Sequence, residues 1–180
     1  FRYKPDNNSP YKTITYREML ADVNGLGTAL IDNGLKGKRI AVIGENSYQW
    51  SVSYLAAVCG TGTVVPFDKE LSSDELKNLV IRADVECVIF SDKYQEIFKE
   101  IKTEGDTKLK ILVNFSLKEK QEEIFSWTEM KEAGKKMIQA GDRRFLDAEI
   151  NNEEMGILLF TSGTTGASKG VMLSHKNIAA

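Results

Sequence analysis

Residues 155–173 read Met155-Gly-Ile-Leu-Leu-Phe-Thr-Ser-Gly-Thr-Thr-Gly-Ala-Ser-Lys-Gly-Val-Met-Leu173, with an apolar run at each end. The ten residues from Thr161 to Gly170 comprise three Gly, three Thr, two Ser, one Ala and one Lys. The apolar runs, 155–161 and 171–173, indicate two strands joined by a loop rich in backbone amides and hydroxyls. Glycine lets the chain approach a ligand closely, and amides donate to phosphate oxygens. The stretch therefore predicts a polyphosphate-binding loop in which Lys169 neutralises charge.

This loop matches neither of the two common phosphate-binding patterns. A Walker A loop has the pattern G-x-x-x-x-G-K-[ST], with glycine immediately before the lysine, whereas Ser168 precedes Lys169 here. A dinucleotide-binding loop has the pattern G-x-G-x-x-G, and no glycine lies two residues from Gly163 on either side. An ordinary solvated turn is the alternative interpretation, but such a turn needs no ten-residue pattern that ends in Lys-Gly.

The segment Thr161–Gly170 resembles the nucleotide loop of the adenylate-forming enzymes, which include acyl-CoA synthetases, aryl-CoA ligases, luciferases and the adenylation domains of peptide synthetases. One departure is Ala167-Ser168, where many members carry a residue followed by proline, so this loop is slightly less rigid. Three earlier segments resemble the same superfamily in order and spacing, namely Ile14–Met19, Arg39–Trp50 and Ala56–Pro66.

Phrases at Phe1–Lys4, Ile14–Arg17 and Asn46–Trp50 resemble the long-chain fatty acyl-CoA synthetase branch. The resemblance implies a ligase that uses ATP, Mg²⁺ and a carboxylic acid, with CoA as cosubstrate, in lipid metabolism. The acid would attack the α-phosphate of ATP to give an acyl-adenylate, and the CoA thiol would then displace AMP. The resemblance assigns binding of the β- and γ-phosphates to Thr161, Ser162, Gly163, Thr164, Thr165, Gly166, Lys169 and Gly170.

The same resemblance implies that much of the active site lies beyond these 180 residues. In the superfamily the adenine pocket, the ribose-binding acid, the acidic magnesium ligand and the catalytic lysine all come later. We therefore assign no catalytic residue and no metal ligand here, and we expect an N-terminal fragment that is inactive alone. Two alternatives remain: an amino-acid adenylation domain with a carrier-protein thiol as acceptor, and a nucleotide-binding α/β module without catalysis.

Strand and helix patterns alternate along most of the chain. Strands are expected at 39–44, 63–67, 85–90, 109–115 and 155–161, and helices lie between them except in the polar segment 142–154. Near-continuous apolar strands that alternate with helices favour an α/β fold with a parallel sheet and helices on both faces. The resemblance makes this fold the incomplete large N-terminal domain of an adenylate-forming enzyme. We divide the chain into an α/β subdomain (1–117), a charged connection with one helix (118–154), and a final strand, phosphate loop and helix start (155–180).

Helix starts are marked by polar residues that can accept a hydrogen bond from a free amide. Expected N-caps are Thr15, Asn46, Ser72, Ser126 and Ser174. The first helix is expected to pack with Tyr16, Met19, Leu20, Val23, Leu26, Leu30 and Ile31 on its apolar face. Gly25 and Gly27 are poor helix formers, so they indicate a close approach of this helix to a neighbour.

Composition excludes several function classes. The net charge is −2 with no basic stripe, which disfavours nucleic acid as a partner. Cys59 and Cys87 lie in apolar segments and are expected to be core residues in a reducing compartment. No apolar run is long enough to span a membrane, so a cytoplasmic protein is expected, and a homodimer is compatible with the resemblance. His175 is interpreted as a first-turn surface residue and Glu153-Glu154 as solvated charges.

Overall fold

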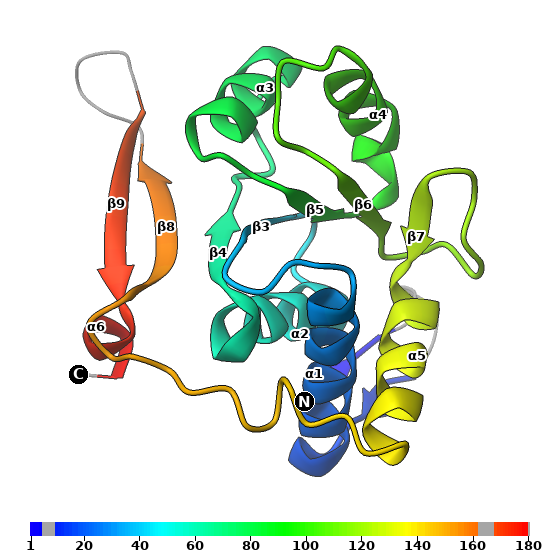
Figure 1. Ribbon diagram of the computed structural model, residues 1–180. Helices are drawn as coiled ribbons and strands as arrows, with labels where there is room; N and C mark the ends of the chain where they lie inside the picture. Colours follow the sequence, from blue (N-terminus) through cyan, green and yellow to red (C-terminus); the bar gives the residue numbers. More distant parts are fainter. Residues whose placement is uncertain (5–9, 162–167, 180) are drawn as a thin grey trace.

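The structure is a computed structural model that describes residues 1–4, 10–161 and 168–179 of the chain. In these residues the main sheet contains seven strands in the spatial order β7-β6-β5-β3-β4-β8-β9 (Figure 1). The strands are β3 (Arg39–Ile43), β4 (Thr63–Pro66), β5 (Cys87–Phe90), β6 (Ile111–Asn114), β7 (Ile124–Ser126), β8 (Met155–Thr161) and β9 (Lys169–Ser174). The helices are α1 (Tyr16–Asp32), α2 (Tyr48–Ala56), α3 (Ser73–Arg82), α4 (Gln95–Thr103), α5 (Trp127–Gln139) and α6 (His175–Ala179).

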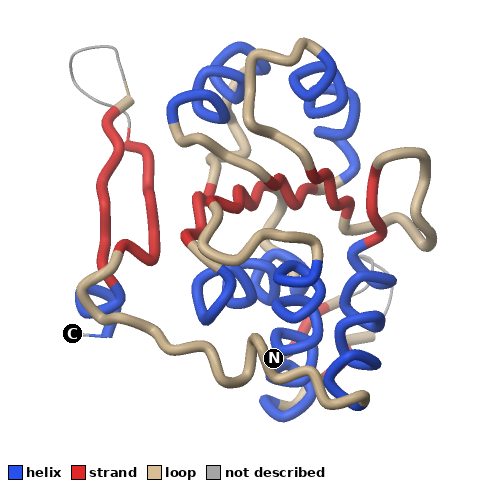
Figure 2. The backbone as a smooth tube through the Cα atoms, in the orientation of Figure 1, coloured by secondary structure: helices blue, strands red, loops and turns tan. Residues whose placement is uncertain are grey.

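Neighbouring strands of the sheet are parallel except β8 and β9, which form an antiparallel hairpin at one edge. Helices α1, α2 and α5 cover one face, and α3 and α4 cover the other, as Figure 1 and Figure 2 show. The predicted α/β fold with helices on both faces is therefore confirmed. The structure adds strand β7 and a small antiparallel sheet of β1 (Arg2–Tyr3) and β2 (Lys12–Thr13), which the sequence patterns did not predict.

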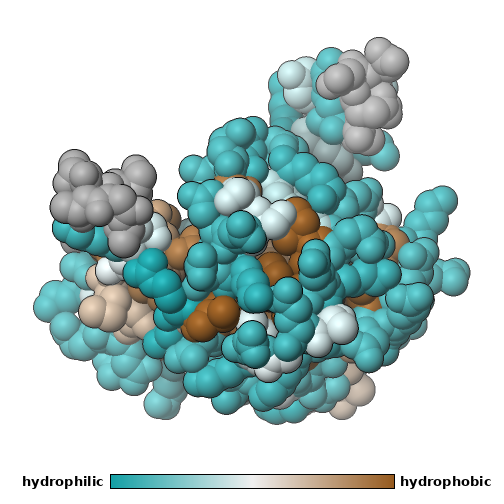
Figure 3. Space-filling view, turned by 90° about the horizontal axis from the view of Figure 1, so that it is seen from above, coloured by the Kyte–Doolittle hydropathy of each residue, from teal (hydrophilic) through white to brown (hydrophobic). Residues whose placement is uncertain are grey.

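Strand β3 shows why the strand patterns are almost continuously apolar. Successive side chains of a strand point to opposite faces, so Ile40 and Val42 are buried under α1 and α2. Ala41 and Ile43 are buried in the second core, under α3 and α4. The outer face of α3 and α4 is mostly hydrophilic, with hydrophobic residues in small groups only (Figure 3). Each helix therefore supplies its apolar face to the sheet and its polar face to solvent.

The predicted helix N-caps are confirmed except at α2. Thr15 and Ser72 form complete capping boxes with Glu18 and Glu75, and the hydroxyl of Ser126 accepts a hydrogen bond from the amide of Glu129. For α2 the prediction of Asn46 is wrong, because the hydroxyl of Ser47 accepts from the Trp50 amide at 3.1 Å. Ser47 has extended backbone angles, and starting one residue later lets Val52 and Ala56 face the core. A π-helical turn, Ala57–Thr61, follows α2, and its backbone leaves helical angles at Cys59 and at Gly60, where φ is 151°.

Helices α1 and α5 cross at glycines. A Cβ at Gly134 of α5 would lie 1.8 Å from the backbone oxygen of Gly25, and a Cβ at Gly25 would lie 2.6 Å from the backbone oxygen of Lys131. The predicted close approach at Gly25 is therefore confirmed. A Cβ at Gly27 would lie 2.1 Å from the ring of Phe145, so this glycine makes room for a side chain. Since van der Waals contact needs more than 3 Å, only glycine fits these positions.

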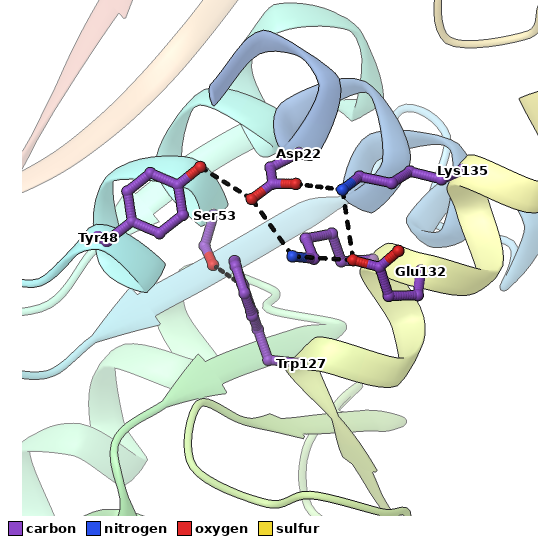
Figure 4. A network of polar contacts seen from close by, with 7 residues as sticks. Asp22, Tyr48, Ser53, Trp127, Glu132 and Lys135 are labelled. Atoms are coloured by element: carbon purple, nitrogen blue, oxygen red, sulfur yellow. Dashed lines mark hydrogen bonds and ion pairs between the residues drawn. The ribbon is translucent and has the colours of Figure 1, made fainter. Parts of the chain in front are cut away.

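A buried aspartate joins α1, α2 and α5 beside this crossing (Figure 4). The carboxylate of Asp22 accepts a hydrogen bond from the Tyr48 hydroxyl at 2.8 Å. It also lies 2.5 Å from the ammonium of Lys135 and 3.3 Å from that of Lys131. Burial opposes ionisation of Asp22, but the hydrogen bonds from Lys135 and Tyr48 and the charges of both lysines hold its pKa below the usual value. The carboxylate is therefore ionised and paired at neutral pH.

Three residues that the sequence placed in the core are exposed. Tyr16 and Leu20 are 87% and 59% exposed, although both lie in the apolar pattern of α1. Cys59 is also exposed, whereas Cys87 is buried as predicted. Periodicity identified the helix correctly, but the apolar pattern is wider than the face that α5 and the sheet cover. Among the described residues no helix is long and apolar enough to cross a membrane.

Candidate functional site

The β8–β9 hairpin carries the sequence-predicted phosphate loop. Its strands pair from Met155↔Ser174 to Thr161↔Lys169, and the connection between them includes residues 162–167. Ser162, Gly163, Thr164, Thr165 and Gly166 lie outside the described residues. Of the predicted site residues, the structure describes Thr161, Lys169 and Gly170, and all three are exposed. Lys169 and Gly170 are already in β9, so the prediction that β9 begins at Val171 is wrong by two residues.

The base of the hairpin is anchored in the sheet. Ile157 pairs with Val64 of β4, the only register pair between β8 and β4 in the described part of the chain. The hydroxyl of Thr63 donates to the backbone oxygen of Met155 at 3.0 Å. Ile157 and Leu158 are buried, whereas Leu159 is 38% exposed. The far half of the hairpin therefore projects beyond the sheet, as Figure 1 shows at the upper left.

The far half makes a lateral contact with α3 instead. Arg82, the last residue of α3, donates to the hydroxyl of Ser168 at 3.2 Å and to its backbone oxygen at 2.9 Å. Its guanidinium also lies over the ring of Phe160, 5.6 Å from the centroid. Arg82 cannot be predicted as part of this site from the sequence, because a basic residue in the last turn of a helix is common and gives no sign of a distant partner.

Gly170 of β9 leaves room for the side chains of Leu158 and Phe160, which belong to the neighbouring strand β8. A Cβ at this position would be 3.3 Å from Cδ1 of Leu158 and 3.5 Å from Cε1 of Phe160. The first distance is tighter than ordinary van der Waals contact, so a larger residue would displace Leu158 or Phe160. Gly170 therefore serves the packing of the hairpin in this structure, independently of any role toward phosphate.

The hairpin turn follows the carboxyl end of β8. In open α/β sheets, ligands bind beyond the carboxyl ends of the parallel strands. The same edge carries a charged cluster from the ends of β3, β4 and β5, in which Lys69 and Lys93 lie 2.9 and 3.1 Å from the carboxylate of Glu45. Hydrogen bonds from these two lysines lower the pKa of Glu45. The position of the turn in the sheet thus agrees with a ligand site.

Two of the cavities elsewhere in the described part of the chain adjoin residues named above. The larger of these two, about 560 Å³, is a mainly apolar groove between α1, α2 and residues 145–150, and Tyr16 and Leu20 are among its lining residues. The smaller, about 180 Å³, lies at the amino ends of β4 and β8 and is lined in part by His175. His175 begins α6 as predicted, but its ring packs on Gly156 and is only partly exposed, so its interpretation as a simple surface residue is wrong. Glu153 and Glu154 are exposed as predicted.

Magnesium does not fit the described residues. Among residues 1–4, 10–161 and 168–179, no three His, Cys, Asp or Glu side chains gather as a metal site. The hairpin offers the hydroxyl of Thr161 and the ammonium of Lys169 there, and neither replaces the carboxylate oxygens that Mg²⁺ prefers. The hydroxyl of Thr161 and the ammonium of Lys169 are groups that suit phosphate oxygens better than a metal ion.

Comparisons with known proteins agree with this arrangement. The family model described as "AMP-binding enzyme" matches residues 3–180. The chain is 27% identical over 181 residues to long-chain-fatty-acid–CoA ligase 5 of Rattus norvegicus, covering 95% of this chain and 26% of the relative. It is 29% identical over 178 residues to the rat long-chain-fatty-acid–CoA ligase ACSBG2, covering 96% and 26%. The chain thus spans about a quarter of the length of these relatives.

Among solved structures, the anthranilate CoA ligase AuaEII in complex with anthranoyl-AMP superposes with a TM-score of 0.79 at 21% identity, covering 97% of this chain and 31% of that one. ATP-bound MatB from Rhodopseudomonas palustris gives a TM-score of 0.73 at 26% identity, covering 99% and 32%. The predicted fold, part of the large N-terminal domain of an adenylate-forming enzyme, is confirmed. With a family model matched over nearly its whole length, this chain belongs to the AMP-binding enzyme family.

Proposed function

We propose that this chain is the N-terminal part of an ATP-dependent acyl-CoA ligase that activates a long-chain fatty acid. The observation that carries the proposal is the family match over residues 3–180, which includes the Thr161–Gly170 motif on the hairpin at the ligand-binding edge of the sheet. The two rat relatives are both long-chain-fatty-acid–CoA ligases, which supports the substrate class. The division of the chain at residues 117 and 154 belongs to the same proposal, as do a cytoplasmic location and a homodimer.

The proposed reaction has two steps. A carboxylate oxygen attacks the α-phosphorus of ATP, the bond from that phosphorus to the bridging oxygen breaks, and pyrophosphate leaves. The CoA sulfur then attacks the acyl carbonyl, the thiol proton is lost, and AMP leaves with the electrons of the broken acyl–oxygen bond. Negative charge moves onto the β- and γ-phosphates in the first step, so groups that hold these phosphates stabilise the departing pyrophosphate.

The contribution of this chain is to hold the departing phosphates. Lys169 would meet a phosphate oxygen as a point charge, and Thr161 and the following hydroxyls and amides would donate hydrogen bonds. Lys169 is paired with Thr161 across the neck of the hairpin, so its backbone position is fixed although its side chain is exposed. The ligands of Mg²⁺, the acyl pocket and the CoA site would come from the remaining length.

Two alternative functions can be distinguished from this one by measuring pyrophosphate exchange. An amino-acid adenylation domain would catalyse exchange of pyrophosphate into ATP with an amino acid and would need a carrier-protein thiol. A nucleotide-binding module would catalyse no exchange with any acid. Exchange that depends on a long-chain fatty acid, followed by thioester formation with free CoA, is the result expected of the full-length enzyme that carries this chain.

Replacing Lys169 with alanine in the full-length enzyme should slow pyrophosphate exchange about 10- to 100-fold. A charge-assisted hydrogen bond to phosphate contributes roughly 1.5–3 kcal/mol, and this loss would be expressed in the transition state. Lys176→Ala is the matched control, because Lys176 is an exposed lysine of α6 whose ammonium lies 3.0 Å from Glu153, at the base of the hairpin. Exchange at the normal rate in Lys169→Ala would exclude Lys169 from the phosphate site.

The 180-residue chain alone should bind ATP with a dissociation constant of about 1 mM or weaker, an affinity worth roughly 4 kcal/mol. The phosphate contacts would be made by this chain, but the pocket for the base would come from the remaining length. Titration calorimetry should therefore find the same weak affinity for ATP, GTP and inorganic triphosphate. A micromolar affinity for ATP, or a preference for ATP over GTP, would show that the chain already contains a pocket for the base.

A further inference from the structure

The contacts of Arg82 with the hairpin reach both of its strands. The guanidinium donates to the hydroxyl and the backbone oxygen of Ser168, the residue before β9, and it covers the ring of Phe160 near the end of β8. Among the described residues, these hydrogen bonds and this ring contact are its side-chain interactions, and all of them go to the hairpin. Arg82 therefore joins the end of β8 to the residue that precedes β9.

The hairpin needs such a lateral contact. Beyond Ile157, β8 has no register pair with β4 in the described residues, and β9 is the edge strand of the sheet. From Leu159 to Thr161 and from Lys169 to Val171, the side chains are exposed or only partly buried. An antiparallel pair of strands standing alone is marginally stable in water. The far ends of β8 and β9 consequently depend on contacts from a neighbouring element, and Arg82 of α3 supplies such contacts.

We propose that Arg82 is a positioning residue for ATP, which fixes the neck of the hairpin so that Lys169 meets the phosphates. This inference rests on the proposed function, and it goes beyond it by adding a residue from α3, 87 positions before Lys169 in the chain. Arginine suits the role because its planar guanidinium donates to two acceptors and stacks on an aromatic ring at the same time. Lysine has the charge but cannot make this set of contacts.

The first test is kinetic. In the full-length enzyme, Arg82→Ala should raise the KM for ATP in pyrophosphate exchange about three- to tenfold, the range for losing one or two hydrogen bonds at an exposed site. The KM for the acid should stay unchanged. Arg82→Lys should behave like Arg82→Ala, since the charge remains but the paired hydrogen bonds are lost. Lys77→Ala is the matched control, because Lys77 is also in α3 but pairs with Glu104, away from the hairpin.

Combining Arg82→Ala with Lys169→Ala tests whether Arg82 acts through Lys169. If it does, Arg82→Ala should raise the KM for ATP only slightly further in a protein that already lacks the Lys169 ammonium. If the kinetic effects of the two substitutions are fully additive in the double variant, the proposal is overturned, because Arg82 would then act independently of Lys169. Wild-type kinetics of Arg82→Lys would also overturn it, because positive charge alone would then suffice. Wild-type kinetics of Arg82→Ala would exclude any role.

Hydrogen exchange gives a readout that does not depend on activity. In Arg82→Ala, peptides covering 157–161 and 169–173 should exchange faster than in wild type, and in Lys77→Ala they should not. Unchanged exchange in Arg82→Ala would overturn the proposed fixing of the hairpin. A wild-type enzyme without any pyrophosphate exchange would instead refute the proposed function, and faster hydrogen exchange in Arg82→Ala would still establish that Arg82 fixes the hairpin.

Discussion

Gly134→Ala is expected to lower the free energy of unfolding by about 3 kcal/mol, at the upper end of the usual range for overpacking. The new Cβ would lie 1.8 Å from the backbone oxygen of Gly25, 2.7 Å from its carbonyl carbon and 3.0 Å from the amide nitrogen of Ala29. All three atoms are backbone, so no side chain can rotate away. Helices α1 and α5 would have to separate, and the core beneath them would lose contact.

The sign of the stability change in Gly134→Ala distinguishes a close helix crossing from an effect of helix propensity. Helix propensity alone would make Gly134→Ala stabilising by up to about 1 kcal/mol, because alanine is the better helix former. The neighbouring change Ala133→Gly is the control, because Ala133 is exposed on the same helix. The stability lost in Ala133→Gly therefore measures helix propensity alone, without a change in packing. Urea unfolding should show a loss of about 1 kcal/mol for Ala133→Gly and a larger one for Gly134→Ala. A more stable Gly134→Ala protein would contradict the close crossing of α1 and α5.

The order of strands and helices was largely predictable, because it depends on local patterns. The capping boxes at Thr15 and Ser72 involve residues three apart, and the buried strands are short apolar runs. Strand β7 was not predicted because it has three residues and follows a charged segment, 118–123. The hairpin partner of β8 was predicted as a strand but begins two residues earlier, since pairing with Thr161 extends it to Lys169.

The candidate site was predictable only as far as its motif is contiguous. The segment Thr161–Gly170 can be identified from one stretch of sequence, and so can the closeness of Thr161 to Lys169. Arg82 could not be found in this way, because the sheet order that brings α3 beside the hairpin is a tertiary feature. The exposed positions of Tyr16 and Leu20 were mispredicted for a related reason. A helical pattern shows which face is apolar but not how much of that face a neighbour covers.

Asp22→Asn is expected to lower the free energy of unfolding at pH 7 by about 2–3 kcal/mol. Removing one partner of a buried ion pair costs roughly 3–5 kcal/mol, and the loss should be smaller here because the side chain of Lys135 is 28% exposed. Asparagine keeps the shape of Asp22 and can still accept from Tyr48. Lys131 and Lys135 would keep their ion pairs with Glu132, which lies 3.0 and 3.3 Å from their ammonium groups.

The control for Asp22→Asn is Asp32→Asn in the same helix. Asp32 lies 2.8 Å from Arg144, but both side chains are substantially exposed. An exposed ion pair contributes about 0–1 kcal/mol, so Asp32→Asn should change the free energy of unfolding by less than about 1 kcal/mol. Equal losses in the two variants would contradict the special position of Asp22 between α1, α2 and α5.

The dependence on pH identifies the ionised carboxylate as the cause. The pKa of Asp22 is lowered in the folded state. The contribution of its carboxylate to the free energy of unfolding is therefore complete above the pKa of the unfolded chain, about 3.9, and is lost as the pH falls through the pKa of the folded state. The stability difference between wild type and Asp22→Asn should therefore narrow below about pH 4. For Lys135, burial lowers the pKa, but the hydrogen bonds and charges of Asp22 and Glu132 outweigh it and raise the pKa. Its contribution is present below the unfolded value of about 10.4 and is lost as the pH rises through the folded value.

Urea unfolding of both proteins at about pH 3 and pH 7 measures the change for Asp22. A difference that narrows toward pH 3 would follow from an ionised Asp22 held by Lys131 and Lys135. A difference that stays constant down to about pH 3 would contradict charge as the cause, because the loss in Asp22→Asn would then not depend on the ionisation of Asp22.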